Sequence, residues 1–171
     1  MDRVYAAWRL GHPKGKGSDG LDHVDLEPAK GKTLFETIEQ SDFADEQTYI
    51  VSRSEYSFVL MNVFPYTPGH LMVLPKRPVT KIDELSDDEY IDIWLQVRKA
   101  TKAVKKAFEP HGLNIGLNEG TAGGGSIPDH LHIHVVPRWT ADTNFLTTIS
   151  NARILPITLA ESWQKIKDNW K

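Results

Sequence analysis

Hydrophobic and polar positions alternate most regularly between residues 130 and 136. Histidines occupy positions 130, 132 and 134, and aliphatic residues occupy the positions between and after them. A period of two is typical of a β-strand with two unlike faces, so we predict a strand over 130–138 with three imidazoles on one face. Burial of Leu131, Ile133 and Val135 on the opposite face would fix the register of the strand and hold the histidines in place.

Further apolar runs predict a sheet made mainly of antiparallel strands. Runs at 49–52 and 57–63 flank a short polar turn and indicate a hairpin, and another strand is expected at 70–75. A strand at 113–118 is expected to pair antiparallel with the histidine strand, because a connection of about ten residues is too short for a helical crossover.

Three helices are predicted from capping signals and helical periodicity. A long helix begins after Ser86, which forms a capping box with Glu89, and ends near Phe108. Tyr90 and Trp94 widen its apolar stripe, which we expect to pack on the sheet. A short helix follows Thr33, with Glu36 completing its capping box, and a C-terminal helix is expected over 158–170, with its apolar side formed by Leu159, Trp163 and Ile166.

Composition narrows the class of protein. A chain of 171 residues, 40% hydrophobic, fits one domain, which we place at 33–171 after a partly flexible extension at 1–32. The absence of cysteine excludes disulfides and thiolate metal sites. With no signal peptide or long apolar run, a cytoplasmic protein is expected. A net charge of −3 with scattered lysines indicates neither a nucleic-acid nor a membrane partner.

The row of histidines admits three interpretations. It could be a solvated strand face, although three of the seven histidines of the chain on alternate positions argue against chance. It could bind a metal, but the outer two α-carbons of an extended strand lie about 13 Å apart, too far for all three to share one ion easily. Or a central imidazole acts as nucleophile or base while its neighbours position it.

A glycine-rich loop before the histidines favours the chemical interpretation. Residues 118–126 read Asn-Glu-Gly-Thr-Ala-Gly-Gly-Gly-Ser and supply backbone N–H groups suited to an anion, typically phosphate. Alone, such a loop is more often a surface turn. Beside a row of imidazoles, it predicts a phosphate site.

These motifs resemble the histidine triad (HIT) family. Its signature, His-x-His-x-His followed by apolar residues, matches 130–136, and the family's glycine loop matches 118–126. Residues 62–71, a polar residue eight positions before the histidine of a Pro-Gly-His turn, match a second fixed segment. The stretches 137–139 and 142–145 are similar to a prokaryotic branch associated with diadenosine tetraphosphate phosphorylases and hydrolases. The similarity extends roughly over 33–159.

The resemblance implies a fold and a set of site residues. The fold would be α+β, with an antiparallel sheet of about five strands, two main helices and a homodimer that extends the sheet. His132 would be the nucleophile, assisted by His134 on the phosphate, while His130 either orders the site or is a purely structural histidine. Substrate contacts would come from a base pocket, a ribose site and the phosphate loop, formed by Leu34, Phe35, Ile38, Asn62, Asn118, Gly125 and Ser126. Ordinary core packing is an equally simple role for the three apolar residues.

The expected activity is cleavage of an adenosine-containing polyphosphate at its α-phosphate through a nucleotidyl-histidine intermediate, by hydrolysis or phosphorolysis. Arg138, Asn144 or Lys76 could line the pocket of an attacking phosphate. The alternatives are a nucleoside phosphoramidase and a nucleotide-binding signal protein. The resemblance implies no cofactor beyond a divalent cation carried by the substrate. Relatives often bind structural zinc through Cys-x-x-Cys where Thr33 and Glu36 stand here, so we predict that this zinc is absent.

Overall fold

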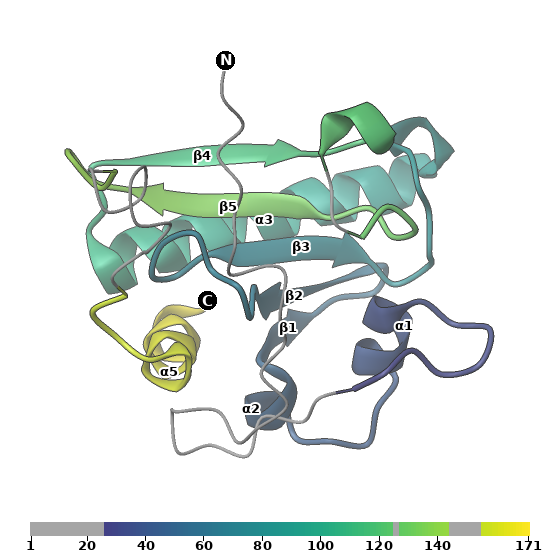
Figure 1. Ribbon diagram of the computed structural model, residues 1–171, viewed down its shortest axis with the longest axis horizontal. Helices are drawn as coiled ribbons and strands as arrows, with labels where there is room; N and C mark the ends of the chain where they lie inside the picture. The colour runs from purple at the N-terminus through teal and green to yellow at the C-terminus, as the bar shows by residue number, and fades with distance from the viewer. Residues whose placement is uncertain (1–25, 125–126, 144–154) are drawn as a thin grey trace.

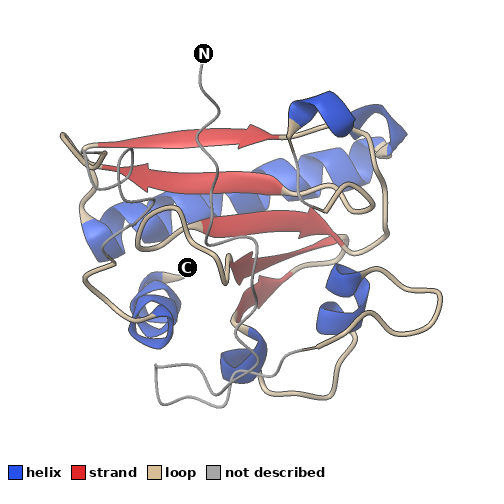
Figure 2. Cartoon of the chain, viewed as in Figure 1, coloured by secondary structure: helices blue, strands red, loops and turns tan. Residues whose placement is uncertain are grey.

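A five-stranded antiparallel sheet forms the centre of the molecule (Figures 1 and 2). The computed structural model describes residues 26–124, 127–143 and 155–171. The spatial order of the strands is β1-β2-β3-β5-β4, and every neighbouring pair is antiparallel. Their bounds are β1 Ile50–Arg53, β2 Ser57–Met61, β3 Leu71–Pro75, β4 Gly112–Leu117 and β5 Ile133–Arg138. The predicted hairpin and the predicted pairing of 113–118 with the histidine segment are both confirmed.

The three predicted helices are present, and two of them begin at the predicted capping boxes of Thr33 and Ser86. Thr33, Ser86 and Thr158 are the N-caps of α1 (Leu34–Glu39), α3 (Asp87–Phe108) and α5 (Leu159–Asn169), and each takes part in a capping box. A short α2 (Asp45–Thr48), which the sequence analysis did not anticipate, leads into β1, and 3₁₀ turns occupy Ile82–Glu84 and Thr121–Gly123. None of the helices in the described segments combines the length and apolar character needed to cross a bilayer.

Helix α3 covers one face of the sheet, as Figure 1 shows. Its buried positions pack with odd-numbered residues of β2, β3 and β5 and with Trp163 and Ile166 of α5. Tyr90 and Trp94 do not belong to this interface, contrary to the prediction: their exposed fractions are 45% and 38%. The reason is geometric, because both lie on the flank of the helix rather than on the stripe through Ile93 and Val97.

The opposite face of the sheet carries a smaller apolar cluster closed by α1. Phe35 of α1 packs there with residues of β1, β2 and β3, namely Ile50, Phe58, Leu60, Met72 and Leu74. Met72 pairs with His134 in the sheet, so this histidine projects from the same face. The sheet therefore separates the α3 core from a face on which α1 and the histidine motif meet.

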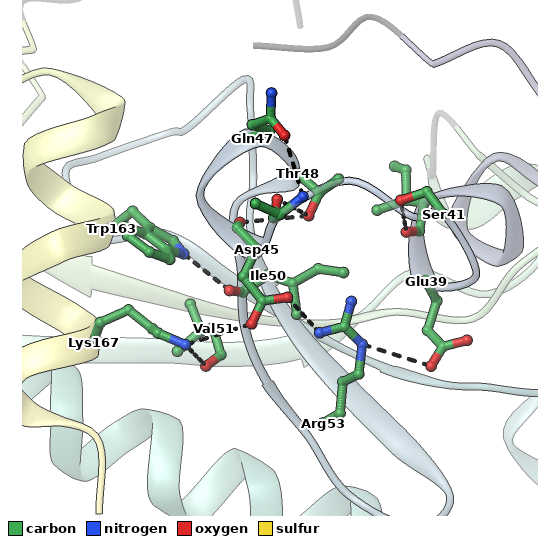
Figure 3. A network of polar contacts seen from close by, with 12 residues as sticks. Glu39, Ser41, Asp45, Gln47, Thr48, Ile50, Val51, Arg53, Trp163 and Lys167 are labelled. Carbon is green, nitrogen blue, oxygen red and sulfur yellow. Dashed lines mark hydrogen bonds and ion pairs between the residues drawn. The ribbon is translucent and has the colours of Figure 1, made fainter. Parts of the chain in front are cut away.

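Side chains of α5 protect the outer strand β1 (Figure 3). Trp163 Nε1 donates to the Ile50 carbonyl at 3.0 Å, and Lys167 Nζ donates to the Val51 carbonyl at 3.0 Å. Arg53 at the end of β1 forms ion pairs with Asp45 of α2 and Glu39 of α1. These contacts satisfy carbonyls of an edge strand and link three helices to it.

Candidate active site

The histidine motif lies at the start of β5 rather than inside it. The strand begins at Ile133, so His130 and His132 precede it, and the prediction of one strand with three imidazoles on a single face was wrong in this respect. The cause is a backbone bond outside the sheet, from the Leu131 N–H to the Val79 carbonyl at 2.7 Å. Leu131, Ile133 and Val135 are nevertheless buried, as predicted.

Both ring nitrogens of His130 form hydrogen bonds within the protein. Its exposed fraction is 1%, its Nε2 donates to the Pro75 carbonyl at 2.8 Å, and its Nδ1 lies 2.8 Å from the Thr33 hydroxyl. Because a carbonyl only accepts, Nε2 carries the proton, and the neutral ring accepts from Thr33 at Nδ1. Burial lowers the pKa of His130, against opposing effects of the Pro75 carbonyl, Glu36 and Asp129.

His132 is oriented by the backbone of the same motif. Its Nδ1 donates to the His130 carbonyl at 2.9 Å. The neutral ring therefore carries its lone pair on Nε2, which is the form that a nucleophilic or basic imidazole requires. Its ring centroid lies 5.7 Å from that of Phe35 and 4.9 Å from that of His134.

His134 is paired with a fourth histidine, His70, which our set of candidate residues missed. His70 Nδ1 accepts from the Tyr66 N–H at 3.1 Å, so its proton lies on Nε2. That Nε2 donates to His134 Nδ1 at 2.9 Å. A neutral His134 must then carry its own proton on Nε2, where the ring acts as a hydrogen-bond donor.

The loop before β3 fixes the position of His70. Gly69 has φ +78°, and a Cβ at this position would lie 2.6 Å from the Phe108 ring, so only glycine fits. Asn62, the predicted ribose contact, approaches the same histidine: its Nδ2 lies 3.4 Å from His70 Nδ1. Its Oδ1 accepts from the Phe64 N–H at 2.9 Å and retains a second lone pair. A histidine directly before an apolar strand was the signal that could have identified His70.

The predicted base-pocket residues divide into buried and partly buried side chains. Phe35 is buried and contacts the rings of both His130 and His132, with centroids 5.6 and 5.7 Å apart. Ile38 packs on the same apolar cluster and is partly buried. Leu34 has intermediate exposure and lies in the first turn of α1. Phe35 is therefore a core residue that also contacts the histidines.

The described part of the glycine loop lies beside the motif. Leu117 pairs with Ile133, so Asn118 follows β4 at the end of the sheet where His132 precedes β5. Gly120 and Gly124 have positive φ, and the Glu119 carboxylate anchors the loop by accepting from the Ile82 N–H at 3.0 Å. The predicted phosphate contacts Gly125 and Ser126 lie outside the described residues, as does Asn144.

Arg138 lies away from the histidine motif. It lies at the far end of β5, about 20 Å from His132 along an extended strand. Its guanidinium is occupied by the Asp142 carboxylate and the Asn114 side chain. The ion pair holds the pKa of Asp142 far below its usual range. Lys76 lies nearer, directly after Pro75, with its Nζ 3.9 Å from Glu39.

The atoms near His130 do not suit the zinc ion expected in relatives. The Thr33 hydroxyl is bonded to His130, and the Glu36 carboxylate accepts from the Thr33 N–H at 2.8 Å. Structural zinc is bound by thiolates and imidazoles, and the chain has no cysteine. Across 26–124, 127–143 and 155–171, no group of three or more His, Cys, Asp or Glu side chains is placed to hold a metal.

Comparisons with known proteins identify a family and several relatives. Residues 44–141 match the family model described as HIT domain. An AP-4-A phosphorylase from Mycobacterium tuberculosis is 40% identical over 127 residues, covering 74% of this chain and 65% of the relative. A bis(5'-adenosyl)-triphosphatase from Dictyostelium discoideum is 35% identical over 92 residues, covering 54% of this chain and 61% of the relative. The chain thus spans less than two thirds of the length of these relatives.

Solved structures share the fold. A Zn-bound histidine triad family protein from Mycobacterium smegmatis matches with a TM-score of 0.65 at 20% identity, covering 80% of this chain and 91% of that protein. The antiparallel sheet, the histidine motif and the family model agree, and together they show that this chain belongs to the histidine triad family.

Proposed function

We propose that the protein cleaves adenosine-containing dinucleoside polyphosphates, such as diadenosine tetraphosphate, at an α-phosphate through a covalent nucleotidyl intermediate on His132. The observation that carries this proposal is the pair of fixed tautomers. His132 has its lone pair on Nε2 because Nδ1 donates to the His130 carbonyl, and His134 has its proton on Nε2 because Nδ1 accepts from His70. A nucleophile and a donor thus lie on adjacent rings, 4.9 Å between centroids.

The first step forms one bond and breaks one bond at phosphorus. The Nε2 lone pair of His132 attacks the α-phosphorus, and the bond from phosphorus to the bridging oxygen breaks. The leaving nucleotide departs with the bonding electrons as a phosphate anion. His134 Nε2–H donates to a non-bridging oxygen as negative charge builds there. A divalent cation bound to the polyphosphate would balance the charge of the leaving group.

The second step transfers the nucleotidyl group from His132 to an acceptor. Attack by inorganic phosphate yields a nucleoside diphosphate, and attack by water yields a nucleoside monophosphate. In either case the P–N bond breaks, the imidazole recovers its lone pair, and the proton of the attacking acceptor is released to solvent. We propose phosphate as the preferred acceptor, because the AP-4-A phosphorylase matches over more of this chain, at 40% identity, than does the triphosphatase, at 35%.

The nucleotide is proposed to lie across the α1 face of the sheet. The base would pack beside Phe35, Leu34 and Ile38, and the second lone pair of Asn62 Oδ1 would accept from a ribose hydroxyl. Backbone N–H groups of the loop after Asn118, including Gly125 and Ser126, would contact the phosphates. Phe35 supports this placement because its ring already contacts His132.

The proposal is tested with purified protein and diadenosine tetraphosphate, with and without inorganic phosphate. With phosphate, we expect ADP plus ATP; AMP plus ATP would identify a hydrolase, and two ADP would contradict attack at an α-phosphate. His132→Gly should abolish turnover while AMP binding persists, and undiminished turnover would overturn the proposal. Faster cleavage of adenosine phosphoramidate than of the tetraphosphate would instead identify a phosphoramidase.

We also propose that the protein is a homodimer joined along α3 and β4. Tyr90, Ile91, Trp94 and Leu95 expose apolar side chains on α3, and Ile115 does so on β4, which pairs only with β5 among the described strands. Exposed apolar surface and a sheet edge that pairs with no further described strand both favour self-association. Light scattering should give twice the chain mass of 19.3 kDa, and Trp94→Glu should lower it. A monomeric wild type would exclude the dimer.

A further inference from the structure

We infer that Thr33, a residue of the helix cap, positions the reactive histidine. Its hydroxyl donates to His130 Nδ1, and the carbonyl of His130 in turn fixes the proton of His132. This inference rests on the proposed role of His132 as nucleophile, and it concerns a residue 97 positions away from His130 in the sequence.

The direction of each bond follows from the donors and acceptors present. Thr33 Oγ1 accepts from the Glu36 N–H at 3.2 Å, which completes the helix cap. His130 Nε2 donates to the Pro75 carbonyl and therefore has no second proton to give in the neutral ring. The Thr33 hydroxyl proton is thus the one that satisfies His130 Nδ1 at 2.8 Å.

His130 has little freedom once both nitrogens are bonded. Its ring is clamped between α1 and the end of β3, and Phe35 meets it edge-on with an interplanar angle of 86°. A clamped side chain fixes the backbone to which it is attached. The carbonyl of His130 accepts from His132 Nδ1 at 2.9 Å. The bonds that hold the His130 ring therefore also hold the acceptor that orients His132.

The consequence for catalysis concerns the tautomer of His132. If the His130 carbonyl moves, the Nδ1–H group of His132 loses its acceptor, and the proton redistributes to Nε2. A ring with its proton on Nε2 has no lone pair there with which to attack phosphorus. Thr33 therefore acts as a positioning residue through His130, in addition to capping α1.

Three variants separate positioning from capping. Thr33→Val removes both the donor and the cap. Thr33→Asp keeps a strong N-cap but replaces the donor by a carboxylate, which only accepts. Glu36→Ala weakens the capping box and leaves the Thr33 hydroxyl in place. Thr33→Ser retains both functions and is the matched conservative control, and Thr37→Val removes a hydroxyl of the same helix that bonds to the backbone of Ala29 and Thr33.

The readouts are steady-state kinetics and the ¹⁵N NMR signals of the histidine rings, which report the tautomers without requiring turnover. We expect Thr33→Val to lower kcat about tenfold with KM within about twofold, as for loss of one buried hydrogen bond. The His132 signals should shift toward protonation at Nε2. Thr33→Ser and Thr37→Val should resemble the wild type, and Glu36→Ala should lower the melting temperature without moving the His132 signals.

Thr33→Asp keeps the test valid if Thr33→Val does not fold. Facing a carboxylate, His130 can restore its bond only by protonation at Nδ1, so its imidazolium signals should appear at higher pH than in the wild type. The Glu36 and Asp129 carboxylates and the His132 ring act electrostatically on His130 in both proteins, so the difference isolates position 33. His132 and His130 signals that are unchanged in both variants would overturn the inference. Loss of turnover in His132→Gly tests the proposed function separately.

Discussion

His70 Nε2, in the residue directly before β3, lies 2.9 Å from Nδ1 of His134 in β5, although the two residues are 64 positions apart in the sequence. The Tyr66 backbone N–H fixes the tautomer of His70, and His70 fixes that of His134. The Tyr66 amide therefore determines, through the His70 ring, that His134 carries its proton on Nε2, where it is proposed to donate to the phosphate. This relationship makes His70 part of the site, although it does not belong to the triad.

Replacement of His70 tests this relationship. In His70→Ala, His134 Nδ1 is left without its donor in a part-buried position, which costs about 1–3 kcal/mol. We expect kcat for diadenosine tetraphosphate to fall about 10- to 100-fold with AMP affinity preserved. His111→Ala is the matched control, because His111 is exposed and bonds Thr140 at the other end of the sheet. Equal kcat values for the two variants would show that His134 does not need its partner.

Gly69 is predicted to be essential for the stability of the site. Gly69→Ala places a Cβ against the Phe108 ring at a positive φ, and the two effects together should lower the free energy of unfolding by about 2–4 kcal/mol. Urea denaturation measures the loss. Gly112→Ala, where an added Cβ meets no heavy atom within 4 Å, is the control and should change it by less than about 1 kcal/mol. A similar loss in both variants would contradict the steric explanation.

The Arg77–Glu89 pair is predicted to make the free energy of unfolding fall as the pH is lowered into the acid range. The Arg77 guanidinium, which bonds both carboxylate oxygens, and the Ser86 N–H lower the pKa of Glu89 from 4.5 to about 2. A carboxylate whose pKa is lower in the folded than in the unfolded protein stabilises the fold at pH values above its unfolded pKa. This contribution is lost as the pH falls through its folded pKa. The free energy of unfolding of the wild type at pH 6 should therefore exceed that of Glu89→Gln by on the order of 2 kcal/mol. This figure is reduced because the Arg77 side chain is half-exposed.

The difference between wild type and Glu89→Gln should shrink steadily as the pH is lowered from about 4.5 to about 2. Urea denaturation at pH 6, 4 and 2.5 checks this expectation. A difference that stays constant over the range would mean that the Arg77–Glu89 pair does not control the titration.

Arg138 is predicted to be dispensable for turnover. Its guanidinium is bound to Asp142 and Asn114, and Arg138 is the last residue of β5, whereas His132 directly precedes the first. Arg138→Met should leave kcat/KM within about twofold and should instead lower stability by on the order of 2 kcal/mol, because its charged hydrogen bonds to Asp142 are part-buried. If turnover by this variant no longer depended on inorganic phosphate, Arg138 would be identified as a contact of the attacking phosphate.

Local sequence signals were sufficient for most of the fold. The capping boxes at Thr33 and Ser86 need only residues three positions apart, and both mark the start of a helix. The pairing of β4 with β5 followed from the length of their connection. Periodicity failed for Tyr90 and Trp94, because an apolar side chain on the flank of a helix has the same local pattern as one facing the core.

The site was harder to predict because its geometry depends on contacts between distant segments. His132 and His134 came from one local motif, but the bond of Leu131 to Val79 that takes His130 and His132 out of the strand has no local signature. The pairs His70–His134 and Thr33–His130 likewise join residues 64 and 97 positions apart. Such pairs follow from strand order and helix docking, which a single sequence specifies only through the finished fold.

The cap of α1 also bears on where the working unit of this protein begins. The stretch recognised by the family model, 44–141, contains the triad but excludes both α1 and α5. A polypeptide trimmed to those limits would keep His132 yet lose Phe35 beside it, and it would uncover the carbonyls of Ile50 and Val51 that α5 now binds. The smallest active fragment should therefore extend in both directions beyond the part that the family model matches. Helix α1 would complete the proposed substrate face, and α5 would cover the carbonyls of the edge strand β1.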